Sequence, residues 1–201
     1  IHSELVIKNE KRKPSPENVR PVHWLGPVTM KIAYLDCLSG ISGDMTLGAL
    51  IDAGIDPATI QTGLDSLGLP SCQLVVEETT RHGFRAINVQ VKHDEQHSHR
   101  HLHHITEMID NSDLTASQKE LATRIFQQLA EAEARVHNSS IEKVHFHEVG
   151  AVDSIADVVG SAIGWDLLNV DKVMTVTVGD NYAQTVSKDS SEDVSGNKGS
   201  K

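Results

Sequence analysis

The sequence predicts an α/β fold, a split β-α-β-β-α-β sheet covered by helices, with a disordered tail at each end. Two observations support this. Segments with helical apolar spacing alternate with β-prone runs at residues 31–37, 73–78, 84–91 and 173–178. The ends are rich in Ser, Asp, Gly, Lys and Pro and offer little to bury. We therefore expect a disordered extension over 1–29, one domain over 30–179 and a disordered or aberrant tail over 180–201.

The first half of this domain begins with the strand at 31–37, followed by a glycine-rich turn and a helix in which Met45, Leu47 and Leu50 follow helical spacing. Pro57 suits the first turn of a second helix that ends near Leu67. The runs at 73–78 and 84–91 are expected to pair as antiparallel strands, because the residues between them favour a turn.

The second half is mainly helical. A short helix is expected over 102–109, and Thr115 with Gln118 forms a capping-box signal for a long helix that reaches Val136. Its buried stripe is predicted from apolar spacing to contain Leu121, Ile125, Leu129, Ala132 and Val136. A third helix, over 149–168, has its own predicted stripe of Val152, Ala156, Val159 and Ile163.

Composition limits the classes of ligand. The formal net charge of −10 argues against nucleic acid and anionic membranes as partners and favours cations. Cys37 and Cys72 form no C-x-x-C pair, which fits reduced thiols in a cytosol. No run approaches the roughly 18 apolar residues of a membrane helix, and no signal peptide is recognisable. We expect a cytoplasmic protein.

The first motif, DCLSGISGDM, occupies residues 36–45 at the strand-to-helix turn. Glycines there let a backbone approach a ligand, and helix-start amides attract phosphate, while carboxylates favour a phosphate that carries a divalent cation. The candidate ligand-binding residues are Asp36, Ser39, Gly40, Ser42, Gly43 and Asp44. A tight turn capped by Ser42 or Asp44 explains the same pattern equally well.

The second motif, HFHEVGAVDSIAD, begins at residue 145. In an extended segment His145 and His147 point the same way, so that both imidazoles can reach one ion, with carboxylates following on the next helix. Imidazole with carboxylate suits nickel, iron, zinc or manganese. The predicted metal ligands are His145, His147, Glu148, Asp153 and Asp157. Half-buried histidines with ordinary helix capping are the alternative.

The third feature is a histidine run, with six of the twelve histidines between residues 93 and 104. Such tracts often bind metal loosely, and ordering a loop costs entropy, so capture and hand-over of an ion fit better than rigid catalysis. The residues predicted for loose capture are His97, His99, His101, His103 and His104. A solvated, pH-sensitive loop is the alternative.

Together, DCLSGISGDM, the residues around Arg100 and HFHEVGAVDSIADVVG resemble the landmarks of the LarC family. The resemblance spans residues 30–179 and corresponds to the N-terminal part of the family's chain. It implies binding of Ni²⁺ and its insertion into pyridinium-3,5-bisthiocarboxylic acid mononucleotide. The product is the nickel-pincer cofactor of lactate racemase-type enzymes.

The resemblance also implies a CTP-dependent nickel-inserting lyase, or cyclometallase. Family members continue into a second domain thought to bind CTP with a divalent metal, so we expect a truncated chain without that site. A separate C-terminal half and the recipient racemase are the expected protein partners. Two other functions stay open at this point: a non-catalytic histidine-rich nickel store or chaperone, and a metal-dependent phosphohydrolase built on the glycine turn.

Overall fold

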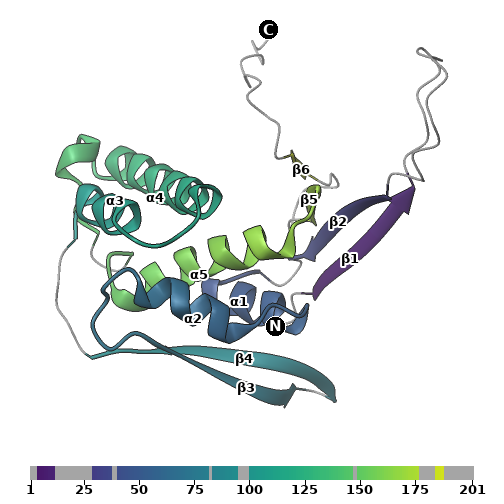
Figure 1. Ribbon diagram of the computed structural model, residues 1–201. Helices are drawn as coiled ribbons and strands as arrows, with labels where there is room; N and C mark the ends of the chain where they lie inside the picture. The colour runs from purple at the N-terminus through teal and green to yellow at the C-terminus, as the bar shows by residue number, and fades with distance from the viewer. Residues whose placement is uncertain are drawn as a thin grey trace, which may run out of the picture. The chain divides into compact units, whose positions relative to one another are not determined.

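The computed structural model describes residues 4–11, 29–37, 40–81, 83–94, 100–146, 149–176 and 184–187 (Figure 1). The chain divides into two compact units, one formed by residues 1–40 and 170–201 and the other by residues 41–169. Among the described helices, none is both long and apolar enough to cross a bilayer. The predicted boundaries at residues 29 and 179 stay predictions.

The first unit is built on a four-stranded sheet of order β1-β2-β5-β6. β1 (Glu4–Lys11) is antiparallel to β2 (Thr29–Asp36), and β2 is parallel to β5 (Lys172–Val176). β6 (Gln184–Ser187) is antiparallel to β5. β1 and β6 lie in the two ends of the chain, where the sequence predicts no strand. The other residues of those ends lie outside the described ranges.

One pair of hydrogen bonds sets the parallel register of this sheet. The Lys31 amide donates to Asp171 Oδ2 over 2.7 Å, and the Asp171 amide donates to the Lys31 carbonyl oxygen over 2.8 Å. Ile32 then lies opposite Lys172. An aspartate directly before β5 thus joins both strands at the point where their pairing begins.

The described part of the second unit contains a hairpin and five α-helices. The helices are α1 (Gly43–Asp52), α2 (Pro57–Asp65), α3 (Leu102–Asp110), α4 (Ala116–Val136) and α5 (Val152–Leu168). A short 3-10 turn, Ile141–Lys143, follows α4. α5 runs through the middle of the unit and packs against α1, α2 and α4 (Figure 1).

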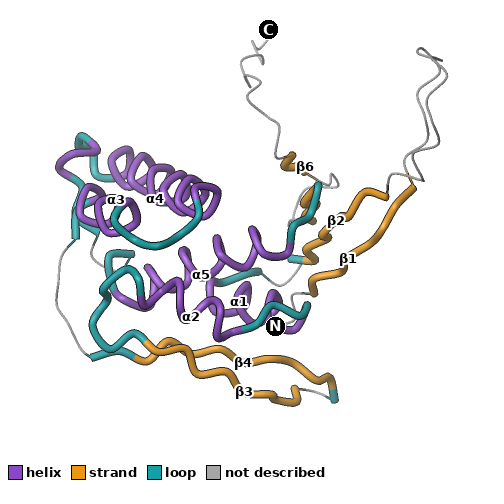
Figure 2. The backbone as a smooth tube through the Cα atoms, in the orientation of Figure 1, coloured by secondary structure: helices purple, strands orange, loops and turns teal. Residues whose placement is uncertain are grey.

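The hairpin consists of β3 (Gln73–Arg81) and β4 (Phe84–Lys92), paired antiparallel as the sequence predicts. It runs beside α1 and α2 (Figure 2). The predicted α/β class is confirmed, but the strands do not form a single split sheet. β3 and β4 make a two-stranded sheet of their own, and β4 buries Val89 in the helical core of its unit.

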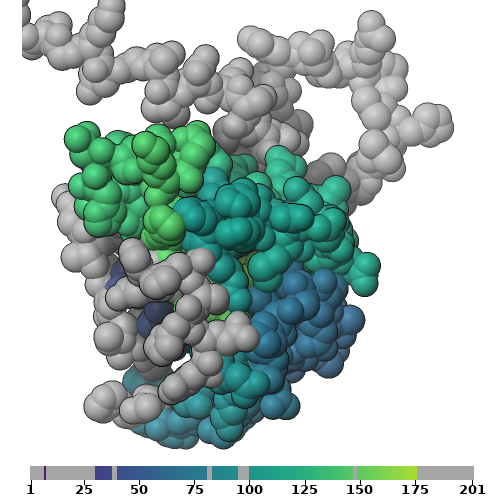
Figure 3. All heavy atoms as spheres, turned by 90° about the vertical axis from the view of Figure 1, so that its left-hand side faces the viewer, coloured from purple at the N-terminus to yellow at the C-terminus, as the bar shows by residue number. Residues whose placement is uncertain are grey.

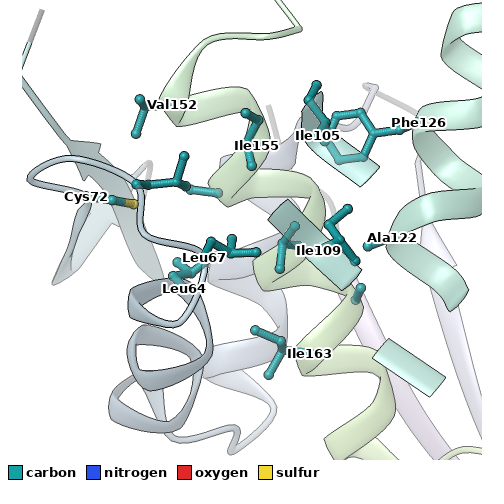
Figure 4. Packing of buried hydrophobic residues seen from close by; sticks show 14 of the residues in the cluster. Leu64, Leu67, Cys72, Ile105, Ile109, Ala122, Phe126, Val152, Ile155 and Ile163 are labelled. Atoms are coloured by element: carbon teal, nitrogen blue, oxygen red, sulfur yellow. The ribbon is translucent and has the colours of Figure 1, made fainter. Parts of the chain in front are cut away.

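The helices of the second unit enclose one apolar core (Figure 4). The stripe predicted for α5 is confirmed, since its four residues are all buried. The stripe predicted for α4 is wrong at its C-terminal end, because Ala132 is exposed and Val136 is 80% exposed, whereas Leu121 and Leu129 are partly buried against the core. The buried positions of α4 are instead Gln118, Ala122, Phe126, Ala130 and Ala134. Alanine at successive turns allows neighbouring helices to approach closely, and the larger aliphatic residues flank that contact.

The predicted cap of α4 is confirmed and also connects two helices. Thr115 Oγ1 accepts from the Gln118 amide over 3.2 Å, and Gln118 Oε1 accepts from the Thr115 amide over 3.0 Å. Gln118 Nε2 donates to Asp166 Oδ2 over 3.0 Å. A capping box is therefore bonded to the last turns of α5, which explains why a glutamine is buried here.

We expect Gly48→Ala to destabilise the protein by about 1–2 kcal/mol, although alanine favours a helix by about 1 kcal/mol. A Cβ at residue 48 would lie 2.6 Å from the Ile87 carbonyl oxygen of β4, a backbone atom that cannot move alone. Gly160→Ala is the comparison variant: the nearest atom there is the tip of the Leu47 side chain, which can shift, so we expect a smaller loss of stability. Denaturant unfolding of both variants checks this, and equal effects would contradict the backbone clash.

Candidate functional site

His101 precedes helix α3 as its N-cap, and its ring contacts a distant segment of the chain. Nδ1 lies 3.0 Å from the Val144 carbonyl oxygen. Because a carbonyl only accepts, Nδ1 donates in this contact. Metal-bound imidazoles commonly donate their other nitrogen to a carbonyl in this way. The contact of His101 with Val144 is therefore of the kind that orients a metal ligand.

Three further imidazoles surround His101, and we call the four residues His101, His103, His104 and His145 the histidine cluster. The ring centroids of His101 and His145 are 4.0 Å apart, and those of His101 and His103 are 5.4 Å apart. His104 Nδ1 accepts from the His101 amide over 3.2 Å, and its ring centroid lies 4.0 Å from that of His103. The fold thus brings together histidines from two separate motifs of the sequence.

A strand-like contact holds His145 beside α3. Arg100 and Phe146 form an isolated antiparallel bridge, in which the Phe146 amide donates to the Arg100 carbonyl oxygen over 3.0 Å. Phe146 is buried with its ring centroid 6.4 Å from that of Phe126, whereas His145 is exposed. The predicted common direction of His145 and His147 stays a prediction, because His147 lies outside the described residues. In Figure 3 the green surface of the segment after α4 adjoins the teal surface of the helices before it.

A second group of donors, the carboxylate group, consists of Asp44, Asp153 and Asp157. Asp44 lies in the first turn of α1, and the other two lie on α5. Asp157 Oδ1 is shielded from solvent and has no hydrogen-bond partner among the described residues. Burial raises the pKa of Asp157 to about 6, with smaller contributions from the charges of Asp44 and Asp153. A cation bound beside these carboxylates would offset both the cost of burying the Asp157 charge and the repulsion from Asp44 and Asp153.

Gly43 makes the carboxylate group possible. A Cβ at this position would lie 2.4 Å from both Cβ and Oδ2 of Asp157, so that only glycine leaves room for the aspartate against the start of α1. Beside it, Asp44 Oδ1 accepts from the Met45 amide over 2.9 Å and from the Ser42 hydroxyl. Ser42 is the N-cap by position but makes no side-chain cap bond. Of the two predicted caps, the structure thus gives Asp44 the hydrogen bond to a helix amide.

The predicted ligand-binding residues of the first motif belong to different units. Asp36 and Gly40 belong to the first unit, whereas Ser42, Gly43 and Asp44 belong to the second. The predicted residues that lie outside the described ranges are Ser39, His97, His99, His147 and Glu148. Within the described ranges, no three His, Cys, Asp or Glu side chains are arranged to hold a metal ion. The ligand set predicted for the metal therefore stays a prediction.

Sequence reasoning did not find two partners of this site. The Arg100 side chain donates from Nη1 to the Gly150 carbonyl oxygen over 2.6 Å, and the Val144 carbonyl fixes the His101 ring. A charged residue directly before a histidine, and a glycine directly before a helix, are weak local signals for such contacts. Both contacts join segments that are distant in sequence, and periodicity does not report on such contacts.

Comparison with known proteins assigns the family. The family model described as "Nickel insertion protein" matches residues 33–185, well over half of the chain. The chain belongs to the nickel insertion protein family. The predicted resemblance to LarC is thereby confirmed. No solved structure matches the chain.

Curated relatives within the nickel insertion protein family are similar over most of this chain. One from Rhodopirellula baltica is 54% identical over 149 residues, which is 74% of this chain and 38% of the relative. One from Desulfitobacterium hafniense, named "Pyridinium-3,5-bisthiocarboxylic acid mononucleotide nickel insertion protein", is 48% identical over 144 residues, 72% of this chain and 36% of the relative. A protein of the same name from Acetivibrio thermocellus is 47% identical over 153 residues, 72% of this chain and 38% of the relative. The chain thus spans less than half the length of these relatives.

We expect Asp157→Asn to stabilise this nickel insertion family member at pH 7.5 by about 1–2 kcal/mol, after allowance for solvent screening. The folded carboxyl ionises near pH 6 and the unfolded one near 3.8, so the folded state binds more protons between these values. Stability attributable to Asp157 therefore falls as pH rises from about 4 to 6 and stays low above that range.

The measurement is denaturant unfolding at pH 4 and at pH 7.5. Asp113→Asn, at an exposed position, is the matched control. We expect the gain from Asp157→Asn to be confined to the higher pH, where the wild-type carboxylate is charged. The same gain at both pH values would show that relief of charge is not the cause.

Proposed function

We propose that this chain captures Ni(II) and delivers it for insertion into pyridinium-3,5-bisthiocarboxylic acid mononucleotide. The observation that carries the proposal is the contact of the His101 and His145 rings, 4.0 Å between centroids, with the His101 ring oriented by the Val144 carbonyl oxygen. Two relatives carry the name of this mononucleotide, which supports it as the acceptor. Nickel is cargo in this scheme rather than a resident cofactor.

Ligand chemistry supports transfer of nickel from the histidines to the mononucleotide. Neutral imidazole is a good ligand for nickel, and geometry rather than affinity selects among similar divalent ions. A ligand set of two imidazoles leaves most coordination positions of Ni(II) open to an incoming molecule. Anionic sulfur atoms of the two thiocarboxylates are stronger and softer donors than imidazole. Nickel would therefore pass from the histidines to the mononucleotide without a change of oxidation state.

The carboxylate group supplies the second part of the proposal. Asp153 and Asp157 are anionic oxygen donors that attract a cation and could hold it during transfer. The full predicted metal set also includes His147 and Glu148. The nucleotide-like part of the substrate is assigned, as a prediction, to Asp36, Ser39, Gly40, Ser42, Gly43 and Asp44. CTP with a divalent metal, the lyase class, the recipient racemase and a cytoplasmic location likewise stay predictions.

We expect His101→Ala to weaken nickel binding by about 10–100-fold, and His101→Ala with His145→Ala to abolish the tight site. The measurement is calorimetric titration of the full chain with Ni(II) at pH 7.5. His137→Ala is the matched control, because this exposed histidine pairs with Glu133 at 3.2 Å on α4 and lies outside the cluster. Unchanged affinity in the double variant would remove the histidine cluster from the proposal.

A nickel-transfer assay distinguishes a delivery protein from a storage protein. The nickel-loaded chain is mixed with the mononucleotide, with and without CTP, and the small-molecule fraction is analysed by mass spectrometry. We expect nickel to appear in that fraction, and less of it from the double variant. If nickel stays on the protein under all conditions, the chain is a store and the insertion proposal fails.

A further inference from the structure

We propose that Arg100 is a positioning residue, which bonds to Phe146 and Gly150 and so holds His145 against His101 for nickel capture. This rests on the proposed function, because the two imidazoles are its cargo site. Arg100 uses both its backbone and its side chain for these bonds. Its carbonyl oxygen accepts from the Phe146 amide over 3.0 Å, and its Nη1 donates to the Gly150 carbonyl oxygen over 2.6 Å.

The contact between Arg100, Phe146 and Gly150 leaves no room for a side chain at position 150. A Cβ at Gly150 would lie 2.8 Å from the Phe146 carbonyl oxygen, 3.1 Å from Phe146 Cβ and 3.3 Å from Arg100 Cβ. The first of these is shorter than real Cβ contacts, and its partner is a backbone atom. Gly150 and Arg100 are therefore both needed for this contact.

The next residue extends the same contact to the cluster. His101 bonds through Nδ1 to the Val144 carbonyl oxygen, so residues 100 and 101 together bond to residues 144, 146 and 150. His145 lies between the first two of these anchor points.

The environment of Arg100 argues against a role in stability alone. Burial lowers the pKa of its guanidinium, and no carboxylate among the described residues lies within ion-pair distance. A cation that is partly removed from water and bonded to a carbonyl oxygen gains little net stability. The planar guanidinium of arginine carries several N–H donors and can fix the orientation of a carbonyl group, which suits a positioning role.

The test compares Arg100→Met with Arg100→Lys in the full chain. Methionine keeps the backbone bond to Phe146 but loses the bond to Gly150, whereas lysine can donate one bond there. We expect Arg100→Met to bind Ni(II) about tenfold more weakly with one fewer imidazole, counted by X-ray absorption, and Arg100→Lys to recover most of the loss. Arg124→Met, at an exposed position of α4, is the matched control.

A merely structural role would lower the melting temperature and leave the affinity and the imidazole count of the folded fraction unchanged. That result for Arg100→Met would overturn the proposal. If Arg100→Met does not fold, Gly150→Ala opens the same contact from the other side, and wild-type binding there would overturn it equally. Failure of wild-type protein to bind nickel through His101 and His145 would instead refute the proposed function.

Discussion

The close approach of α1 to α5 is the constraint on which the second unit depends. Gly160 and Gly164 present no side chains to α1, and the Leu47 and Leu50 side chains fill the space. A Cβ at these glycines would lie 2.9 Å from Leu47 Cδ2 and 2.8 Å from Leu50 Cδ1. Because the two helices approach so closely, Asp157, one turn earlier on α5, is pressed against the start of α1. The packing that closes the core also shields a carboxylate.

This packing gives the candidate site two donor sets of different character. The carboxylates of Asp44, Asp153 and Asp157 raise the local negative potential and favour cations of any kind. The imidazoles of the histidine cluster discriminate among cations by ligand type rather than by charge. On the proposed function, attraction and selection of the cation thus fall to different residues.

Local signals in the sequence predicted the local structure well. The capping box of Thr115 and Gln118, the β3–β4 hairpin and the buried stripe of α5 all depend on residues close in sequence. The stripe of α4 was misjudged because large aliphatic residues dominate a hydrophobic pattern, whereas the packing selected a row of alanines around Phe126. The division of the strands into two sheets depends on which partner covers each strand, which a single sequence does not state.

The same distinction applies to the site. Alternation along an extended segment predicted that His145 and His147 share a direction, but the contact between His145 and His101 depends on the return of the chain after α4. From sequence, the histidine run and the His-Phe-His motif therefore appeared as two sites with two functions, loose capture and tight binding. In the folded unit His101 and His145 are neighbours. On the proposed function, capture and delivery then require no migration of the ion between separate sites, because one imidazole of the histidine run lies against one imidazole of the His-Phe-His motif.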